Sequence, residues 1–144
     1  MTIKLVSDST CDLPLDRLVA HNVHLVPINI QFGSSSYQEN IDLKADAFYK
    51  KIKQERVLPK TSQPSVGQFL AQYQQLIEAN TEIISIHVTG QLSGTCQSAK
   101  LAAEKVADKA KVYVIDSLAG SAGLGWMVVA GSGRGCGAGS CRCW

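Results

Sequence analysis

The sequence lacks long apolar runs, a signal peptide and a strong net charge. None of its apolar runs approaches the roughly 18 residues that span a bilayer, and the N-terminus contains no apolar signal-peptide core. The net charge of +2 over 144 residues is too small to indicate binding to nucleic acid or to an anionic membrane surface. These absences predict a cytoplasmic protein with no transmembrane segment and no nucleic-acid partner.

The motifs of common enzyme classes are also absent. Neither G-x-G-x-x-G nor G-x-x-x-x-G-K-[ST] occurs, and no G-x-S-x-G elbow surrounds Ser93 or Ser121. A hydrolase or phosphotransfer component could still use Ser93 as nucleophile and His87 as base, oriented by Asp8 or Asp116. Because the conspicuous groups are hydroxyls and backbone amides without an obvious base, a binding protein is the preferred interpretation and an enzyme the alternative.

Cysteine is unevenly distributed, and the end of the chain differs from the rest. Cys11 and Cys96 are expected to be free thiols in a reducing compartment. The other three cysteines lie in the last nine residues without a paired fourth ligand, so no metal site is predicted there. From residue 131 the sequence turns to glycine, cysteine and arginine without periodicity. We therefore expect a domain of residues 1–130 and an anomalous tail of residues 131–144, produced by a frameshift or truncation of a longer chain.

Segments with strand and helix periodicity alternate before this tail. Apolar or alternating runs predict strands at 3–7, 24–32, 83–89 and 112–116. Apolar stripes at helical spacing predict helices at 15–19, 45–52, 66–77, 93–106 and 121–130. This alternation predicts an α/β domain with a mostly parallel sheet flanked by helices.

Several residues make local predictions within these elements. Asp42 and Ser93 are expected to cap the helices that follow them, and a capping box is expected to begin at Ser65. Pro27 implies that the 24–32 strand is unpaired on at least one side. Residues 59–65 are expected to form an irregular loop, and the 112–116 strand is expected to be buried.

Hydroxyl-rich loops suggest where a ligand binds. Ligands of parallel sheets gather at the carboxyl ends of the strands, where loops 8–12, 61–65, 90–95 and 116–121 could converge. Gly90 breaks the strand before it and Ser93 begins a helix, so several N–H groups, two hydroxyls and a helix dipole point to one place. The expected ligand there is an anion, either a phosphate or a carboxylate.

Six short motifs follow one another in a recognisable order. They are D-S-T-C-D-L-P at 8–14, V-P-I-N-I-Q-F-G at 26–33, T-S-Q-P-S at 61–65, L-S-G-T-C-Q-S-A at 92–99, V-I-D-S at 114–117 and G-L-G at 123–125. Together they resemble the DegV family, bacterial fatty-acid-binding proteins that include the binding subunits of fatty acid kinase.

The resemblance implies a carrier rather than an enzyme. Such a protein binds one long-chain fatty acid, such as palmitate, without a cofactor or metal, and presents it to a separate fatty acid kinase. In the family, the threonine of T-S-Q-P-S and the serine of L-S-G-T bind the carboxylate, and these positions are Thr61 and Ser93 here. Ser62, Gly94 and Thr95 are neighbours of the site by position.

The resemblance also implies that part of the family's binding surface is missing. Relatives carry a second α/β domain of similar size, with the ligand between the two, and this chain is expected to stop before it. The exposed pocket wall would then favour self-association. Ile28, Ile30 and Phe32 are candidates to line the acyl channel or to form ordinary core. Because burying a methylene gains about 0.8 kcal/mol, the channel is expected to set the affinity and the hydroxyls to set the orientation.

Overall fold

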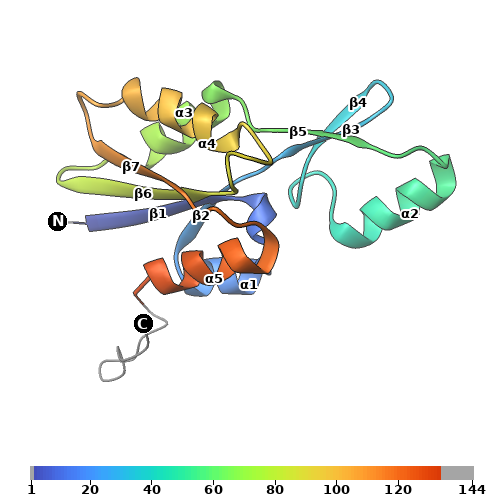
Figure 1. The fold of residues 1–144 in the computed structure, drawn as a ribbon, viewed down its shortest axis with the longest axis horizontal. Helices are drawn as coiled ribbons and strands as arrows, with labels where there is room; N and C mark the ends of the chain where they lie inside the picture. Colours follow the sequence, from blue (N-terminus) through green and yellow to red (C-terminus); the bar gives the residue numbers. More distant parts are fainter. Residues whose placement is uncertain (1, 134–144) are drawn as a thin grey trace.

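The computed structural model describes residues 2–133 and contains a four-stranded parallel sheet in the order β2-β1-β6-β7. Its strands are β1 (Thr2–Asp8), β2 (Val23–Val26), β6 (Thr81–His87) and β7 (Lys111–Asp116). One face is covered by α3 (Val66–Leu76) and α4 (Thr95–Glu104), and the other by α1 (Leu15–Ala20) and α5 (Ser121–Gly131) (Figure 1). The predicted α/β architecture with a mostly parallel sheet flanked by helices is confirmed.

Apolar clusters fill both faces of this sheet. The cluster beneath α3 and α4 includes Val6, Phe69, Tyr73, Ile83 and Ala99. The cluster beneath α1 and α5 includes Leu5, Leu18, Ile86, Leu124 and Val128. The helix at α3 begins with the predicted capping box, in which the Ser65 and Gln68 side chains each accept a backbone N–H from the other's residue. The two central strands, β1 and β6, are therefore largely buried between two helical layers, as expected for parallel pairing.

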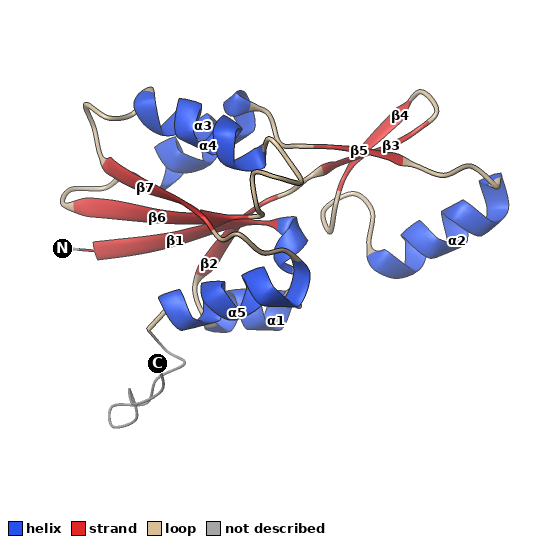
Figure 2. Ribbon diagram, in the orientation of Figure 1, coloured by secondary structure: helices blue, strands red, loops and turns tan. Residues whose placement is uncertain are grey.

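A second, three-stranded antiparallel sheet projects from this body (Figure 2). Its order is β4 (Ser35–Gln38), β3 (Asn29–Phe32) and β5 (Lys60–Ser62), and it is accompanied by α2 (Ala45–Glu55). Ile30, Phe32 and Leu43 form its own small core, against which Phe48 and Ile52 of α2 pack. We call this unit the small sheet. The sequence indicates a turn at residues 33–36 and a brief hairpin return at 37–39, and β3 and β4 do form a hairpin, although β4 begins at Ser35; the third strand, β5, was not predicted.

The predicted single strand at 24–32 is wrong, because the chain changes sheets at Pro27. Proline has no amide hydrogen and cannot continue the hydrogen-bonded ladder. The next amide, that of Ile28, donates to Ser9 Oγ at 3.0 Å, and β3 then pairs within the small sheet. The predicted loop at 59–65 is also partly wrong, because its beginning forms β5 by pairing with β3.

Two further local predictions are corrected. Asp42 does not cap α2, because its carboxylate accepts the Gln38 amide at 2.8 Å instead, and the cap position is Lys44. The strand β7 is an edge strand and only half buried, with 47% of Tyr113 and 44% of Ile115 exposed. One face of β7 therefore packs on the helices while the other meets solvent.

The end of the chain and its cysteines are described in part. Cys11 and Cys96 are buried free thiols, as predicted. The helix α5 ends at Gly131, next to the predicted boundary at residue 130, and most of the predicted tail, including Cys136, lies outside the described residues. Within residues 2–133, no helix has the length and apolar character needed to cross a membrane.

Candidate functional site

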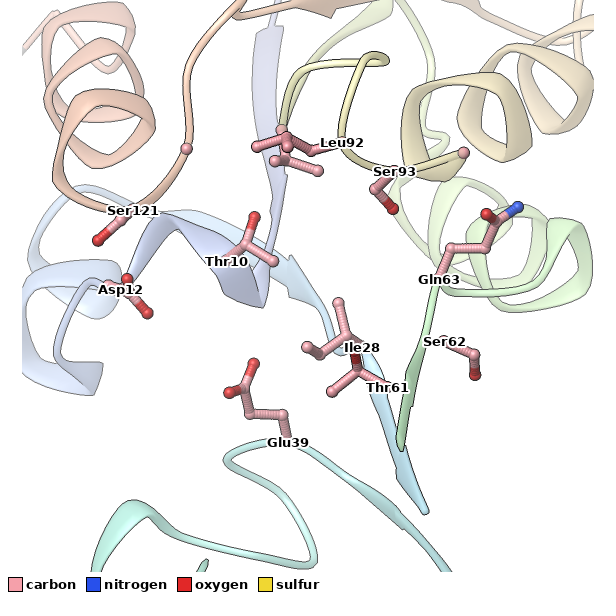
Figure 3. A pocket seen from close by; sticks show the side chains of 13 residues that line it. Thr10, Asp12, Ile28, Glu39, Thr61, Ser62, Gln63, Leu92, Ser93 and Ser121 are labelled. Carbon is pink, nitrogen blue, oxygen red and sulfur yellow. The ribbon is translucent and has the colours of Figure 1, made fainter. Parts of the chain in front are cut away.

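A cleft of about 1030 Å³ opens where the carboxyl ends of the parallel strands meet the small sheet. All four hydroxyl-rich loops contribute to its walls, as the sequence predicted. The lining residues from these loops are Thr10, Asp12, Thr61, Ser62, Gln63, Leu92, Ser93, Gly94, Gly120 and Ser121 (Figure 3). Ile28, Glu39 and Val88 complete the wall and were not predicted as a group, because they come together only through the change of sheets.

The hydroxyls of Thr61 and Ser93 both open onto this cleft, although they belong to different parts of the fold. Thr61 is an exposed residue of β5, and Ser93 is a half-buried residue of the turn between β6 and α4. Within the described part of the chain, the Thr61 hydroxyl has no hydrogen-bond partner, so it is free to donate to a ligand. The structure thus brings the two predicted carboxylate-binding residues to one cavity.

The predicted helix cap at Ser93 is displaced by one residue. Gly94 occupies the cap position of α4, and the Ser93 hydroxyl oxygen accepts the Thr95 amide at 3.3 Å from just outside the helix. Thr95 itself is fully buried and does not line the cleft, in contrast to Ser62 and Gly94. Of the three predicted neighbours, Thr95 therefore contacts the site only through Ser93.

Gln63 holds the β5 end of the cleft against the Ser93 turn. Its side-chain amide donates to Ser98 Oγ at 3.1 Å, and it crosses directly over Gly94. A methyl group on Gly94 would lie only 2.3 Å from Gln63 Oε1. Glycine at this position therefore leaves room for the Gln63 side chain in its observed place. The sequence marks both residues within motifs, but it does not reveal that they touch.

Replacing Gly94 with alanine is expected to displace Gln63 and to weaken ligand binding about fivefold. The backbone at Gly94 has φ −75°, which alanine adopts without strain, so the effect comes from losing the Gln63 bond, which is worth about 1 kcal/mol. Titration calorimetry measures the ligand affinity of the two single variants and of the Gly94→Ala/Gln63→Ala double variant. In the Gln63→Ala background, adding Gly94→Ala should change little, and full additivity would contradict the coupling.

The charge lining the cleft is acidic and lies on one side. Figure 3 shows Asp12 and Glu39 across the cleft from Ser93, and no basic side chain lines the cleft within the described residues. Burial raises the pKa of Glu39, a hydrogen bond with Ser9 opposes this, and the nearby Asp12 and Asp8 raise it further. An anionic group is therefore disfavoured beside Asp12 and Glu39 and favoured at the Ser93 end of the cleft.

The apolar part of the cleft is smaller than predicted. Ile28 lines it together with Val88 and Leu92, of which Leu92 is 79% exposed. Ile30 and Phe32 do not line it, because their side chains point into the core of the small sheet. Ile28 shares their alternation but precedes β3 and lies beside the Ser9 loop, whereas Ile30 and Phe32 lie within β3 and pack with Leu43. Of the two roles that the sequence left open, Ile30 and Phe32 therefore form ordinary core, and Ile28 lines the cleft.

His87 lies outside the cleft in a buried hydrogen-bonded chain. Its Nδ1 is 2.9 Å from Asp8 Oδ2, its Nε2 is 2.6 Å from Ser85 Oγ, and Ser85 Oγ is 2.8 Å from the Tyr73 hydroxyl. All four side chains are fully buried. The order of groups is that of a Ser-His-Asp triad, but its serine is Ser85 and it faces the core.

This arrangement removes the base from the enzymatic alternative. Both nitrogens of His87 are committed within the core, so neither reaches Ser93. Asp116, the other predicted orienting carboxylate, accepts the amides of Gly90 and Leu118 at 3.0 Å and 2.9 Å. Hydrogen bonds from Leu118 and Gly90 lower the pKa of Asp116, which suits a structural anion at a turn. Among the described residues, no group of three or more metal-ligating side chains gathers.

The Asp8 carboxylate connects the buried chain to the wall of the cleft. Besides His87, it accepts the Val88 amide at 3.1 Å, the Thr10 amide at 3.1 Å and the Thr10 hydroxyl. Both Thr10 and Val88 line the cleft. Because the Thr10 hydroxyl donates to Asp8, it is not free to donate to a ligand. The sequence placed both Asp8 and Thr10 in a ligand-facing loop. It did not reveal that Asp8 is buried behind the wall and that Thr10 lines the cleft.

Comparisons with known proteins agree with this geometry. A family described as "Uncharacterised protein, DegV family" matches residues 2–132. The chain is 38% identical over 117 residues to Protein DegV of Bacillus subtilis, a match that covers 81% of this chain and 41% of that protein. The chain therefore spans less than half of the length of this relative.

Solved structures show the same fold in relatives. The crystal structure of DegV, a fatty acid binding protein from Bacillus subtilis, matches with a TM-score of 0.88 and 34% identity, covering 99% of this chain and 50% of that one. A stearic-acid-binding protein from Eubacterium ventriosum matches with a TM-score of 0.84 and 29% identity, covering 94% of this chain and 49% of that one. In each case this chain corresponds to about half of its relative.

Proposed function

The chain belongs to the DegV family, and from this premise we propose that it binds a long-chain fatty acid, such as palmitate, by its carboxylate. One observation carries the proposal: Thr61 of the small sheet and Ser93 of the turn after β6 both line one cleft, in which Asp12 and Glu39 lie across from Ser93. Relatives described as fatty acid binding proteins share the fold. The carboxylate would occupy the side of the cleft formed by Thr61, Ser93 and the start of α4.

Head group and hydrocarbon make different contributions in this proposal. A helix N-terminus contributes about 0.3–1 kcal/mol to binding an exposed anion, and up to about 2 kcal/mol when partly buried. An acyl chain contributes about 0.8 kcal/mol per buried methylene before the costs of association, on the order of 10 kcal/mol for a long chain. The apolar residues Ile28, Val88 and Leu92 therefore support affinity, whereas the hydroxyls determine which end of the ligand enters.

We propose that the protein acts as a carrier in the cytoplasm rather than as an enzyme. The commitment of both His87 nitrogens within the core supports this, because it leaves Ser93 without a base. A fatty acid kinase that phosphorylates the presented carboxylate is the proposed protein partner. The exposed wall at Leu92 supports self-association through a second copy, which would shelter the hydrocarbon.

Native mass spectrometry of the purified protein tests the proposed function. We expect a mass increment equal to a long-chain fatty acid, which disappears after organic extraction and returns on adding palmitate. A protein that carries no lipid and takes up none after extraction would contradict the proposal. Esterase turnover that Ser93→Ala abolishes would support the hydrolase alternative instead.

A further inference from the structure

Thr95 stands directly behind Ser93 and contacts it twice. Its backbone amide donates to Ser93 Oγ at 3.3 Å, and its hydroxyl oxygen lies 2.8 Å from the same atom. Thr95 is the first residue of α4 and has no exposed surface, whereas Ser93 is half-buried at the cleft. The two hydroxyls therefore have different access to solvent and ligand, and this difference fixes the direction of the bond between them.

Donation from Thr95 to Ser93 is the arrangement that leaves no buried group unsatisfied. If Ser93 donated instead, the Thr95 hydroxyl hydrogen would be buried with no acceptor among the residues that the structure describes. An unsatisfied buried donor is costly, and such groups are rare in native proteins. The Ser93 hydrogen has no such restriction, because it faces the cleft and can bind water or a ligand.

The consequence concerns what Ser93 offers to a ligand. A hydroxyl oxygen has two lone pairs and one hydrogen, and the Thr95 amide and hydroxyl occupy both lone pairs. Ser93 then presents only its hydrogen to the cleft. A hydroxyl that accepts two hydrogen bonds is also a stronger donor, because neighbouring bonds polarise one another.

We propose that Thr95 is a positioning residue that makes Ser93 a donor-only group, so that the cleft selects an ionised carboxylate over the alcohol of the same chain length. This inference rests on the proposed function and specifies its head-group chemistry. A carboxylate carries no hydrogen and gains a charge-assisted bond from Ser93. A fatty alcohol brings a hydrogen of its own, for which Ser93 has no free lone pair.

The test compares dodecanoate with dodecan-1-ol, using the full chain stripped of lipid. Affinities are measured for the wild type, for Thr95→Val, which keeps the shape and loses the hydroxyl, and for Thr95→Ser, which keeps the hydroxyl. In Thr95→Val, Ser93 can rotate to accept as well as donate, so we expect the preference for dodecanoate to fall about tenfold. Thr95→Ser should keep the wild-type preference within about twofold.

The ratio of the two affinities separates positioning from a purely structural role. A general loosening of the site weakens both ligands alike and leaves their ratio unchanged. An unchanged ratio in Thr95→Val, or in Thr95→Ala should the valine variant not fold, would overturn the inference while leaving fatty acid binding intact. A wild type that binds both ligands equally would overturn it without any variant. A wild type that binds neither would overturn the proposed function as well.

Discussion

Replacing Asp8 with alanine is expected to lower the free energy of unfolding by several kcal/mol, since each buried donor left without its acceptor costs about 1–3 kcal/mol. The fully buried Asp8 carboxylate accepts hydrogen bonds from His87, Val88 and Thr10. Alanine leaves each of these donors without a partner in a site closed to water. Urea denaturation monitored by circular dichroism measures the change, with the wild type and the variant compared at one pH.

Two matched variants locate the source of this loss. Tyr73→Phe removes only the far end of the buried chain, the bond to Ser85, and should cost about 1 kcal/mol. Asp8→Asn keeps one acceptor oxygen but turns an NH₂ group toward a donor. Its decrease in the free energy of unfolding should therefore lie between those of Tyr73→Phe and Asp8→Ala. An Asp8→Ala variant no less stable than Tyr73→Phe would contradict the role assigned to the carboxylate.

The same carboxylate gives the stability a defined dependence on pH. Burial alone would raise the pKa of Asp8, but the hydrogen bond and charge of His87, with bonds from Thr10 and Val88, outweigh burial and lower it. A group whose pKa is lowered by folding stabilises the protein above its ordinary value of 3.8, and this contribution is lost as the pH falls below that value. The Asp8→Asn variant should lack this acid-sensitive part of the stability.

Replacing both Thr61 and Ser93 with alanine is expected to weaken fatty acid binding by about a hundredfold or more. A hydrogen bond to a charged group contributes about 1.5–3 kcal/mol, and this variant removes two of them. The fold should persist, because Thr61 is exposed and the hydrogen bonds of Ser93 are confined to its own turn. Displacement of a fluorescent fatty acid measures the affinity, and thermal unfolding checks the fold.

A hydroxyl outside the cleft provides the control. Ser36 is an exposed residue of β4 in the small sheet, and it does not line the cleft. Ser36→Ala should therefore leave the affinity unchanged within about twofold. Each single variant, Thr61→Ala or Ser93→Ala, should weaken binding about tenfold or more. A double variant that binds as tightly as Ser36→Ala would contradict the proposed carboxylate site.

The predictions from sequence succeed where one local signal determines one local structure. Apolar runs located the parallel strands, Ser65 located the start of α3, and the order of the loops located the cleft. These features depend on short-range periodicity and on the rule that parallel strands end at one edge. The fold class and the convergence of the four loops were therefore accessible before any coordinates.

The errors arise where distant segments decide the outcome. Alternation from His24 to Phe32 is continuous, so nothing in it reveals that β2 and β3 belong to different sheets. The roles of Glu39 and Gln63 depend on which segments lie opposite them, and Thr95 does not line the cleft, unlike Ser93, because it is buried. Periodicity describes which residues share a face, but it does not say what that face meets.

The backbone enters the small sheet once, through Pro27 and Ile28, and returns to the body once, through residues 63–65. Thr61 belongs to the small sheet and Ser93 to the body, so these two connections separate them. A lipid that binds both hydroxyls would link the small sheet to the body that contains the parallel sheet. A ligand that binds only the folded protein stabilises it by mass action. The temperature of thermal unfolding would therefore rise with the fraction of the protein that carries lipid.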